Sequence, residues 1–450
     1  MTAITSSRID AAARRMLALS AGLLVALVGT GAGAAIEITE RTSPGGILFW
    51  HVEEPAIPMV AFEVRFDGGA ALDSVTRPGV ARMVTALLDE GAGERDALAF
   101  AVEKERRSAR FGFSTGRDGA SVSARMLVDE LAPSAALLAE ALTAPRFDGE
   151  ALERERRRRL SSIRQDATDP DSLARNAWYA RAFPDHPYGQ PAKGTVASVE
   201  AITVDDIRAM HGRLMTLDRA KVAVVGAIDA DGAGALVDSI LGGLPAVAPE
   251  GAAPAAPVDP APPSGMEIID LAVPQSVAIL GHAGIARDDP DYIAAYVMNH
   301  VLGGGGFSSR LMTEVREKRG LAYGTYSYLS DLTDAPLVLA SVSTANERVA
   351  ESLEVIRAEW TRMAENGVSA EELDKAKRYL TGAFPLRFDT NSKIAGFLVA
   401  AQVAELGIDY VDIRNGLIEA VSVEDIRRVA RRLLQPEALS VTVVGQPAGL

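Results

Sequence analysis

The stretch AITVDDIRAMHGRLMTLDRAKVAVVG at residues 201–226 recurs as AVSVEDIRRVARRLLQPEALSVTVVG at residues 420–445. The two stretches align without a gap and are identical at 11 of their 26 positions. Each begins with acidic residues, which favour a helix start because of the helix dipole. Each ends in a β-branched run stopped by glycine, which is typical of a strand. The repeat therefore predicts a duplicated domain with a helix followed by a strand in each copy.

A proline- and alanine-rich stretch, PAVAPEGAAPAAPVDPAPP, lies between the two copies at residues 245–263 and holds seven of the 23 prolines. This composition favours an extended polyproline conformation over a helix or an interior strand. We therefore expect one domain over residues 35–244, a linker over residues 245–265 and a second domain over residues 266–450.

Local patterns predict the class of both domains. Apolar and polar residues alternate over residues 60–66, as in a half-buried strand, and residues 276–280 begin the matching strand of the second half. Long helices are expected over residues 133–144, 149–165, 347–366 and 370–381. Each half is therefore predicted to be an α+β domain, a mostly antiparallel sheet with helices packed on one face.

The first 34 residues have the pattern of a cleavable export signal. Arg14 and Arg15 precede an apolar run over residues 16–29, and Ala32-Gly33-Ala34 offers a small-residue cleavage site near Ala34. The apolar run is short for a membrane span of about 20 residues, which makes an uncleaved anchor the lesser alternative. We expect a periplasmic protein, and the arginine pair leaves both general and twin-arginine export open.

Charge and composition exclude several function classes. The net charge of −14 argues against nonspecific binding to nucleic acid, which depends on Lys and Arg contacts to phosphate. The absence of cysteine excludes disulfides, thiolate metal sites and cysteine nucleophiles. One basic run at residues 154–159 is interpreted as a solvated helix face, with a partner-docking surface as the alternative.

Stretches in both halves resemble the pitrilysin/insulinase family of zinc peptidases, especially its short processing-peptidase-like branch. The resemblance extends from about residue 36 to the end and is most specific at SSRLMTEVREKRGLAY, residues 308–323. It implies a clamshell of two half-shells that enclose a chamber, in which a peptide joins a sheet edge as an extra strand.

Catalytic members of this family carry an inverted zinc motif, H-x-x-E-H, and a distant glutamate as the third protein ligand. The motif falls here on PGVARMVTALLDEG at residues 78–91. The side chains at the corresponding positions cannot bind zinc or act as a general base; they are Arg82, Thr85, Ala86 and, at the distant position, Ser162. The resemblance therefore implies a metal-free chain, with zinc expected in a partner subunit.

The second half keeps the family's substrate-contacting pair. Arg316 and Tyr323 match an arginine and a tyrosine that reach a substrate held at the zinc, and a guanidinium and a phenol can both donate to a peptide carbonyl or its oxyanion. The preceding glycines permit close backbone approach, so Gly304, Gly305 and Gly306 are further candidates for substrate contact. From the residues alone, an alternative is a structural salt bridge of Arg316, a core position for Tyr323 and a merely flexible glycine turn.

No pair of the five histidines has the spacing of a zinc motif. His186 is interpreted as a structural loop residue and His300 as a helix-end or core residue. The leading hypothesis is a metal-free, substrate-binding subunit of a heterodimeric zinc peptidase, with an H-x-x-E-H homologue as partner and a peptide or unfolded polypeptide as substrate. A stand-alone peptide-binding or scaffold protein is the alternative, and a self-sufficient hydrolase would need a constellation that we do not find.

Overall fold

The computed structural model describes residues 36–251, 253–333 and 335–450. The predicted export signal, residues 1–34, lies outside the described residues. Residues 38–450 form one compact unit. None of the helices in the described ranges is both long and apolar enough to cross a membrane.

The first half of this unit contains a six-stranded sheet in the order β1-β2-β8-β3-β7-β6. Neighbouring strands are antiparallel except for β2 and β8, which run parallel. The strands are β1 (Thr39–Thr42), β2 (Leu48–Glu53), β3 (Met59–Asp67), β6 (Arg110–Thr115), β7 (Gly119–Leu127) and β8 (Ala220–Gly226). A separate two-stranded ribbon pairs β4 (Gly91–Ala92) with β5 (Arg95–Asp96).

The second half repeats this order. Its five-stranded sheet runs β11-β12-β10-β13-β9, and the only parallel pair is β13 with β9. The strands are β9 (Gly265–Asp270), β10 (Gln275–Ala283), β11 (Ala322–Ser330), β12 (Leu337–Ala345) and β13 (Ser440–Gly445). The two sequence repeats become equivalent pairs, since α8 (Val204–Leu214) leads into β8 as α15 (Val423–Leu433) leads into β13. The predicted pair of homologous, mostly antiparallel α+β domains is confirmed.

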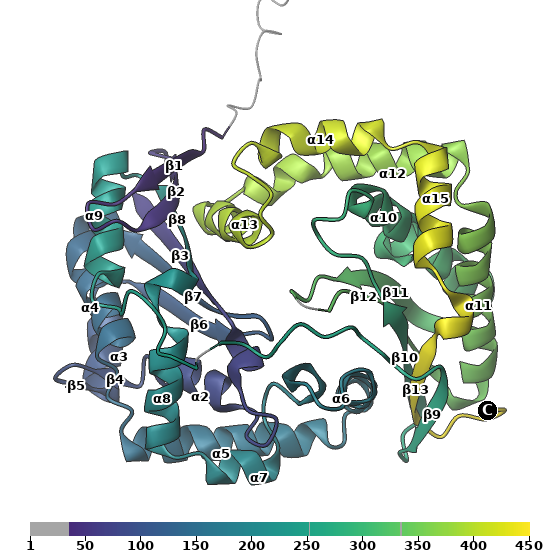
Figure 1. Ribbon diagram of the computed structural model, residues 1–450, viewed down its shortest axis with the longest axis horizontal. Helices are drawn as coiled ribbons and strands as arrows, with labels where there is room; N and C mark the ends of the chain where they lie inside the picture. The colour runs from purple at the N-terminus through teal and green to yellow at the C-terminus, as the bar shows by residue number, and fades with distance from the viewer. Residues whose placement is uncertain (1–35, 252, 334) are drawn as a thin grey trace, which may run out of the picture. The chain divides into compact units, whose positions relative to one another are not determined.

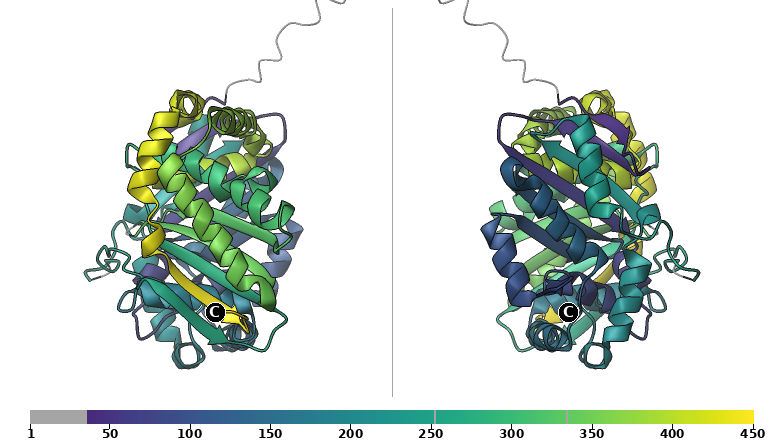
Figure 2. Two further views of the ribbon diagram at one scale, coloured as in Figure 1. Left: turned by 90° about the vertical axis from the view of Figure 1, so that its right-hand side faces the viewer. Right: turned by 90° about the vertical axis from the view of Figure 1, so that its left-hand side faces the viewer.

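Helices cover the outer face of each sheet (Figures 1 and 2). In the first half the alternating apolar side chains of β3, such as Phe62 and Val64, pack into a core with those of the neighbouring helices. In the second half Trp360 fills the corresponding core. Apart from the helices of the repeats, the zinc-motif region and the inner layer described next, the α-helices in the described ranges are α3 (Ala97–Arg106), α4 (Leu131–Thr143), α7 (Val196–Ala201), α9 (Ala230–Leu241), α10 (Tyr292–Asn299), α11 (Val349–Asn366), α12 (Ala370–Gly382) and α14 (Tyr410–Ala420).

The inner faces are covered by an exchange of helices. Helix α6 (Pro170–Ala182) of the first half packs against β10 and β13 of the second, and α13 (Asn391–Val403) of the second half packs against β3 and β8 of the first. Figure 1 shows each of these helices on the inner side of the opposite sheet. The sequence patterns place helices on one face only, and they do not reveal this second, crossed-over layer.

The proline-rich stretch crosses from one half to the other (Figure 1). No helix or strand occurs over its described residues between Pro245 and Ser264. It is attached to α6, because Ala261 donates its backbone N–H to the Ala182 carbonyl at 3.3 Å and Arg181 donates to the Pro263 carbonyl at 3.2 Å. Contacts between the halves merge them into one unit, so the predicted domain limits at residues 35–244 and 266–450 stay a prediction.

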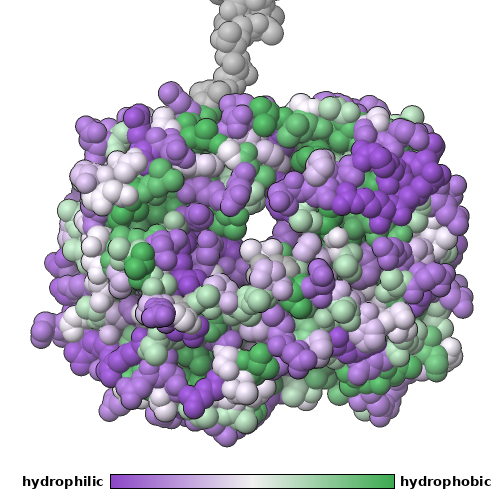
Figure 3. Space-filling model, in the orientation of Figure 1, coloured by the Kyte–Doolittle hydropathy of each residue, from purple (hydrophilic) through white to green (hydrophobic). Residues whose placement is uncertain are grey.

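Within the basic run at residues 154–159, Arg154, Arg157 and Arg158 are exposed, as the interpretation of a solvated helix face predicts, whereas Arg156 and Arg159 are not. The side chain of Arg156 is only 13% exposed and that of Arg159 only 12%. Arg156 donates to the Ile202 carbonyl at 2.7 Å beyond the end of α7, and Arg159 pairs with buried Glu155 at 2.7 Å. A hydrophilic surface also covers α15 (Figure 3), where Arg428 and Arg432 pair with acidic residues.

Candidate functional site

The zinc-motif positions lie on α2 (Val80–Leu87) and α5 (Gly149–Asp166), which pack against each other. Asp73 holds the start of α2, because its carboxylate accepts the backbone N–H groups of Gly79 at 2.7 Å and Ala81 at 2.9 Å. Burial raises the pKa of Asp73 to about 6, although these two hydrogen bonds favour the ionised form.

Arg82, Thr85 and Ala86 line a cavity of about 280 Å³ together with Arg158 and Arg159 of α5. Thr85 is buried, and its hydroxyl lies 2.7 Å from that of Thr115 on β6. The motif positions therefore lie close to α5, but cationic and hydroxyl groups stand where a metal site needs imidazole and carboxylate donors.

The fourth motif position, Ser162, faces another cation. Its hydroxyl accepts a hydrogen bond from the Lys193 ammonium at 3.2 Å, and Lys193 is also paired with Asp166 at 2.7 Å. Within the described ranges no group of three or more His, Cys, Asp or Glu residues is arranged to hold a metal ion. The donor set at these four positions does not fit zinc.

Arg316 and Tyr323 are brought together. Arg316 lies in the π-helix Met312–Glu317, and its guanidinium carbon sits 4.9 Å from the centre of the Tyr323 ring and 4.6 Å from that of the Phe307 ring. Tyr323 is 85% exposed and Phe307 66%. Arg316 has no ion pair among the described residues, so the alternative with a structural salt bridge and a core tyrosine is wrong. Substrate contact by the pair stays a prediction.

An irregularity in the pairing of β11 with β12 leaves Tyr323 outside the regular sheet hydrogen bonding. Strand β11 is an edge strand, and its pairing with β12 shifts between Ala322 and Gly324, leaving Tyr323 at a bulge. Bulges re-aim side chains and are common next to functional sites. Phe307, at the end of the glycine run, was missed from the sequence, although a large aromatic residue beside four glycines could have marked it as an exposed surface residue.

The glycines serve the chain's own packing more than an open surface. Gly304 continues the π-helix His300–Gly304, and a Cβ on it would lie 2.8 Å from Asn299 Nδ2. A Cβ on Gly305 would lie 2.7 Å from the His300 carbonyl oxygen. Of these three glycines, only Gly306 has a positive φ, 57°, and open space around the position of a Cβ. Substrate contact by Gly304, Gly305 and Gly306 stays a prediction, and Gly306 is the one with room for it.

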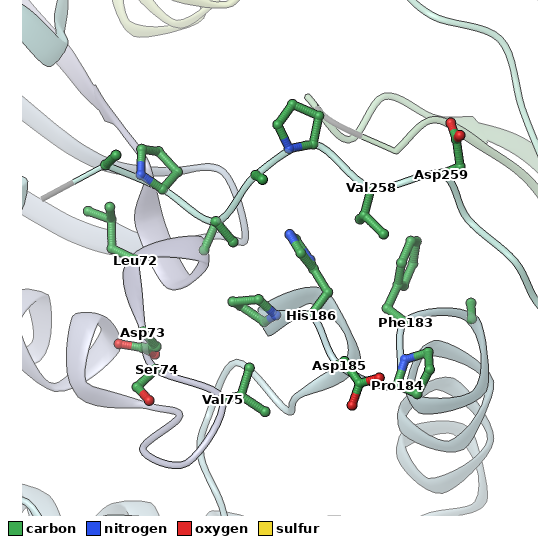
Figure 4. A pocket seen from close by; sticks show the side chains of 18 of the residues that line it. Leu72, Asp73, Ser74, Val75, Phe183, Pro184, Asp185, His186, Val258 and Asp259 are labelled. Atoms are coloured by element: carbon green, nitrogen blue, oxygen red, sulfur yellow. The ribbon is translucent and has the colours of Figure 1, made fainter. Parts of the chain in front are cut away.

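The two singled-out histidines have structural surroundings. His186 is buried, its ring centre is 4.5 Å from that of Tyr188, and its Nδ1 accepts the Tyr188 backbone N–H at 3.2 Å. His186 lines a cavity of about 740 Å³, to which the linker also contributes Val258 (Figure 4). His300 is buried against Tyr379, with ring centres 5.1 Å apart.

Two family profiles match this chain. Residues 51–196 match the one described as insulinase (peptidase family M16), and residues 201–380 match the one described as peptidase M16 inactive domain. Among curated relatives, an uncharacterized zinc protease of Streptomyces coelicolor is 28% identical over 412 residues, covering 91% of this chain and 89% of its own. Non-peptidase homolog YmxG of Helicobacter pylori is 27% identical over 342 residues, covering 76% and 78%.

Solved structures agree with the fold. A protease from Helicobacter pylori, at 20% identity, has a TM-score of 0.82 over 91% of this chain and 100% of that chain. A peptidase M16 inactive domain from Pseudomonas fluorescens is 30% identical, with a TM-score of 0.85 over 92% of this chain and 98% of that chain. Identity at this level over nearly the whole length of both chains, together with the profile matches, shows that the chain belongs to the insulinase family of peptidases, family M16.

Proposed function

We propose that this chain is a metal-free, substrate-binding subunit of a periplasmic zinc peptidase. It supplies Arg316 and Tyr323 to a peptide held at the zinc of a homologous subunit that carries H-x-x-E-H. The observation that carries this proposal is the contact of Arg316 with the exposed rings of Phe307 and Tyr323, with no acidic partner among the described residues.

The chemistry of this pair suits a peptide carbonyl. The guanidinium of Arg316 and the phenol O–H of Tyr323 are both hydrogen-bond donors that can stabilise negative charge developing on a carbonyl oxygen. A guanidinium in contact with aromatic rings can still donate through its N–H groups, which lie in the plane of the fork. Such a pair lacks a nucleophile or a general base of its own, so the hydrolytic step has to come from another subunit.

The composition of the zinc-motif positions supports a non-catalytic role. Arg82 and Ala86 provide no ligand atom for zinc, and Thr85 provides no carboxylate to activate a water molecule. Two relatives are named in the same sense, one as an inactive domain and one as a non-peptidase homolog. Others are named zinc proteases, so the names alone do not decide the role.

Isolation of the native complex tests the proposal. The mature chain is purified with an affinity tag from the cells that make it, and mass spectrometry identifies any bound homologue with an H-x-x-E-H motif. The two chains are then produced separately, and cleavage of a quenched fluorescent peptide is measured for each chain and for the mixture, with and without a zinc chelator.

We expect cleavage only when both chains and zinc are present. A homologue that cleaves the peptide equally fast without this chain would contradict the proposal. A chain that cleaves alone after chelation would show a catalytic site of another kind.

A further inference from the structure

Arg82 stands between two cavities that are both rich in cations. One is the cavity of about 280 Å³ that it lines with Arg158 and Arg159. The other has a volume of about 450 Å³ and is formed by α2, α5, the first turns of α6 and the segment of residues 191–196. Four cationic side chains line this second cavity: Arg82, Arg117, Arg175 and Lys193.

The cations of the larger cavity greatly outnumber its acids. Asp166 is the one acidic residue in its lining, and it is already paired with Lys193 at 2.7 Å. Arg82, Arg117 and Arg175 form no ion pair within the described parts of the chain. The whole protein carries a net charge of −14, so this local excess of positive charge runs against its general character.

Arg117 is the most confined of these cations. Its guanidinium carbon lies 3.9 Å from the centre of the Tyr179 ring, and its Nε donates to the Tyr188 carbonyl at 3.4 Å. Burial lowers the pKa of Arg117. The neighbouring carboxylate of Asp118 offsets this effect only in part, and an anion bound in the cavity would offset more of the cost of removing the guanidinium from water.

Hydroxyl groups add neutral donors to the lining of the same cavity. Ser172 and Thr195 both contribute to it. Arginine forks together with hydroxyl groups are the donors that recognise carboxylates, and hydrogen bonds to charged groups are stronger than those between neutral groups.

The position of the cavity favours a peptide as the source of the carboxylate. Arg175 is a hydrogen-bond partner of Tyr328 on β11. Tyr328 packs beside α6, and Tyr326, two residues earlier on the same face of the strand, is 51% exposed. Since β11 is an edge strand, an extended peptide can pair with it and bring a side chain to Arg175.

We propose that the cavity lined by Arg82, Arg117 and Arg175 binds a carboxylate of an extended acidic peptide. One of the zinc-motif positions, Arg82, thus forms part of an anion-binding pocket in this chain. Binding there needs no partner subunit and no metal.

Fluorescence polarisation with the purified mature chain tests this proposal. The probe is a labelled peptide with three consecutive glutamates in its middle and an amidated C-terminus. One comparison peptide carries glutamine in place of the three glutamates and is amidated, and another carries the same glutamines with a free C-terminus. The variants are Arg82→Gln and Arg175→Gln, and the matched control is Arg157→Gln, an exposed arginine of α5 outside both cavities.

We expect the glutamate peptide to bind the wild-type chain and the Arg157→Gln control equally. Arg82→Gln and Arg175→Gln should each raise the Kd about tenfold or more, because each removes a charge-assisted hydrogen bond. Affinity should fall as salt is added. If the glutamine peptide with a free C-terminus also binds in an Arg82-dependent way, the pocket takes a terminal carboxylate as well, which supports the same chemistry.

Three results would overturn the proposal. One is equal binding of the amidated glutamine peptide. Another is binding of the glutamate peptide that neither arginine variant weakens, with circular dichroism showing both variants folded. The last is Arg82-dependent binding of inorganic phosphate without binding of any peptide. None of these results bears on whether Arg316 and Tyr323 assist a partner's zinc site, so the two proposals fail separately.

Discussion

The indole N–H of Trp178 donates to the backbone carbonyl of Ser440 at 3.1 Å, joining residues that lie 262 positions apart in the sequence. The reciprocal bond runs from the Gln402 side-chain amide of α13 to the Val222 carbonyl of β8 at 2.9 Å. Each half thus donates from its exchanged helix to an interior strand of the other half's sheet. The free energy of unfolding of either half should therefore depend on the other.

Trp178→Phe removes the cross-half hydrogen bond and part of a fully buried ring. We expect a loss of about 1–3 kcal/mol from the bond and its unsatisfied partner, plus a cavity contribution. Gln402→Met should cost about 1 kcal/mol. Urea unfolding followed by circular dichroism measures both. As a control, Gln435→Met changes an exposed glutamine and should stay within about 0.5 kcal/mol; losses no larger than this for Trp178→Phe would refute a stabilising role.

Restoring the zinc motif tests the metal chemistry of α2 and α5. The restoring substitutions are Arg82→His, Thr85→Glu, Ala86→His and Ser162→Glu. Arg159 remains beside this site and Lys193 remains bonded at position 162, so the fourfold variant should bind zinc weakly. Adding Arg159→Ala removes a like charge and should tighten zinc binding about tenfold, measured by competition with a chelating dye. Arg157→Ala is the control addition, and equal gains from both would show that Arg159 does not act on the site.

Tyr323→Phe and Arg316→Lys separate the roles of the proposed substrate-contacting pair in the reconstituted peptidase. If the phenol stabilises an oxyanion, Tyr323→Phe should lower kcat by about 10²–10³. If it only anchors the substrate backbone, the change should appear mainly in KM. Arg316→Lys keeps the charge and loses the planar fork, so it should also lower activity.

Tyr379→Phe and Arg357→Lys are matched controls for this pair, because they alter a tyrosine stacked on His300 and an arginine of α11. Steady-state cleavage is compared at equal amounts of assembled complex. Full activity of both test variants would assign Arg316 and Tyr323 a purely structural role.

Glu63 makes stability depend on pH. It lies on β3 between Phe62 and Val64, on the face opposite to the core they fill, and burial raises its pKa to about 7. An unfolded chain releases this proton near the usual glutamate value of about 4.3. Between these values the folded chain binds more protons than the unfolded one, so the free energy of unfolding contributed by Glu63 falls as pH rises and stays lower above pH 7.

Glu63→Gln removes that loss. At pH 8 the variant should be more stable than the wild type by up to about 3 kcal/mol, and the difference should shrink towards pH 5. Urea midpoints at the two pH values give the comparison. Glu354→Gln changes an exposed glutamate of α11 and should show no such trend; a pH-independent effect of Glu63→Gln would mean that ionisation is not its cause.

The sequence predicted individual elements well where the signal is local. The helices expected over residues 149–165 and 347–366 are observed at Gly149–Asp166 and Val349–Asn366, because their apolar spacing and ends depend on neighbouring residues. The crossed positions of α6 and α13 could not be predicted in this way. Which sheet such a helix covers depends on contacts between residues far apart in the sequence, 262 positions for Trp178 with Ser440 and 180 positions for Gln402 with Val222.

For the candidate site as well, some features could be predicted from the sequence and others could not. The residue types at the zinc-motif positions follow directly from the sequence, and so does the pairing of Arg316 with Tyr323 as a hypothesis. The excess of positive charge around Arg82 does not, since Arg117, Arg175 and Lys193 come from separate segments and gather only in the folded chain. The close packing of Gly304 and Gly305 also depends on atoms that a glycine run does not specify.

The exchange of α6 and α13 has a consequence for how such a chain can be divided. A polypeptide with only one half would carry a helix that packs against a sheet it lacks. The inner face of its own sheet would be exposed to solvent. Two such polypeptides could bury both inner faces only by exchanging that helix, which would make an intertwined dimer. A cut in the linker near Pro254 would accordingly yield fragments that remain associated, because the bonds of Trp178 and Gln402 do not pass through the linker.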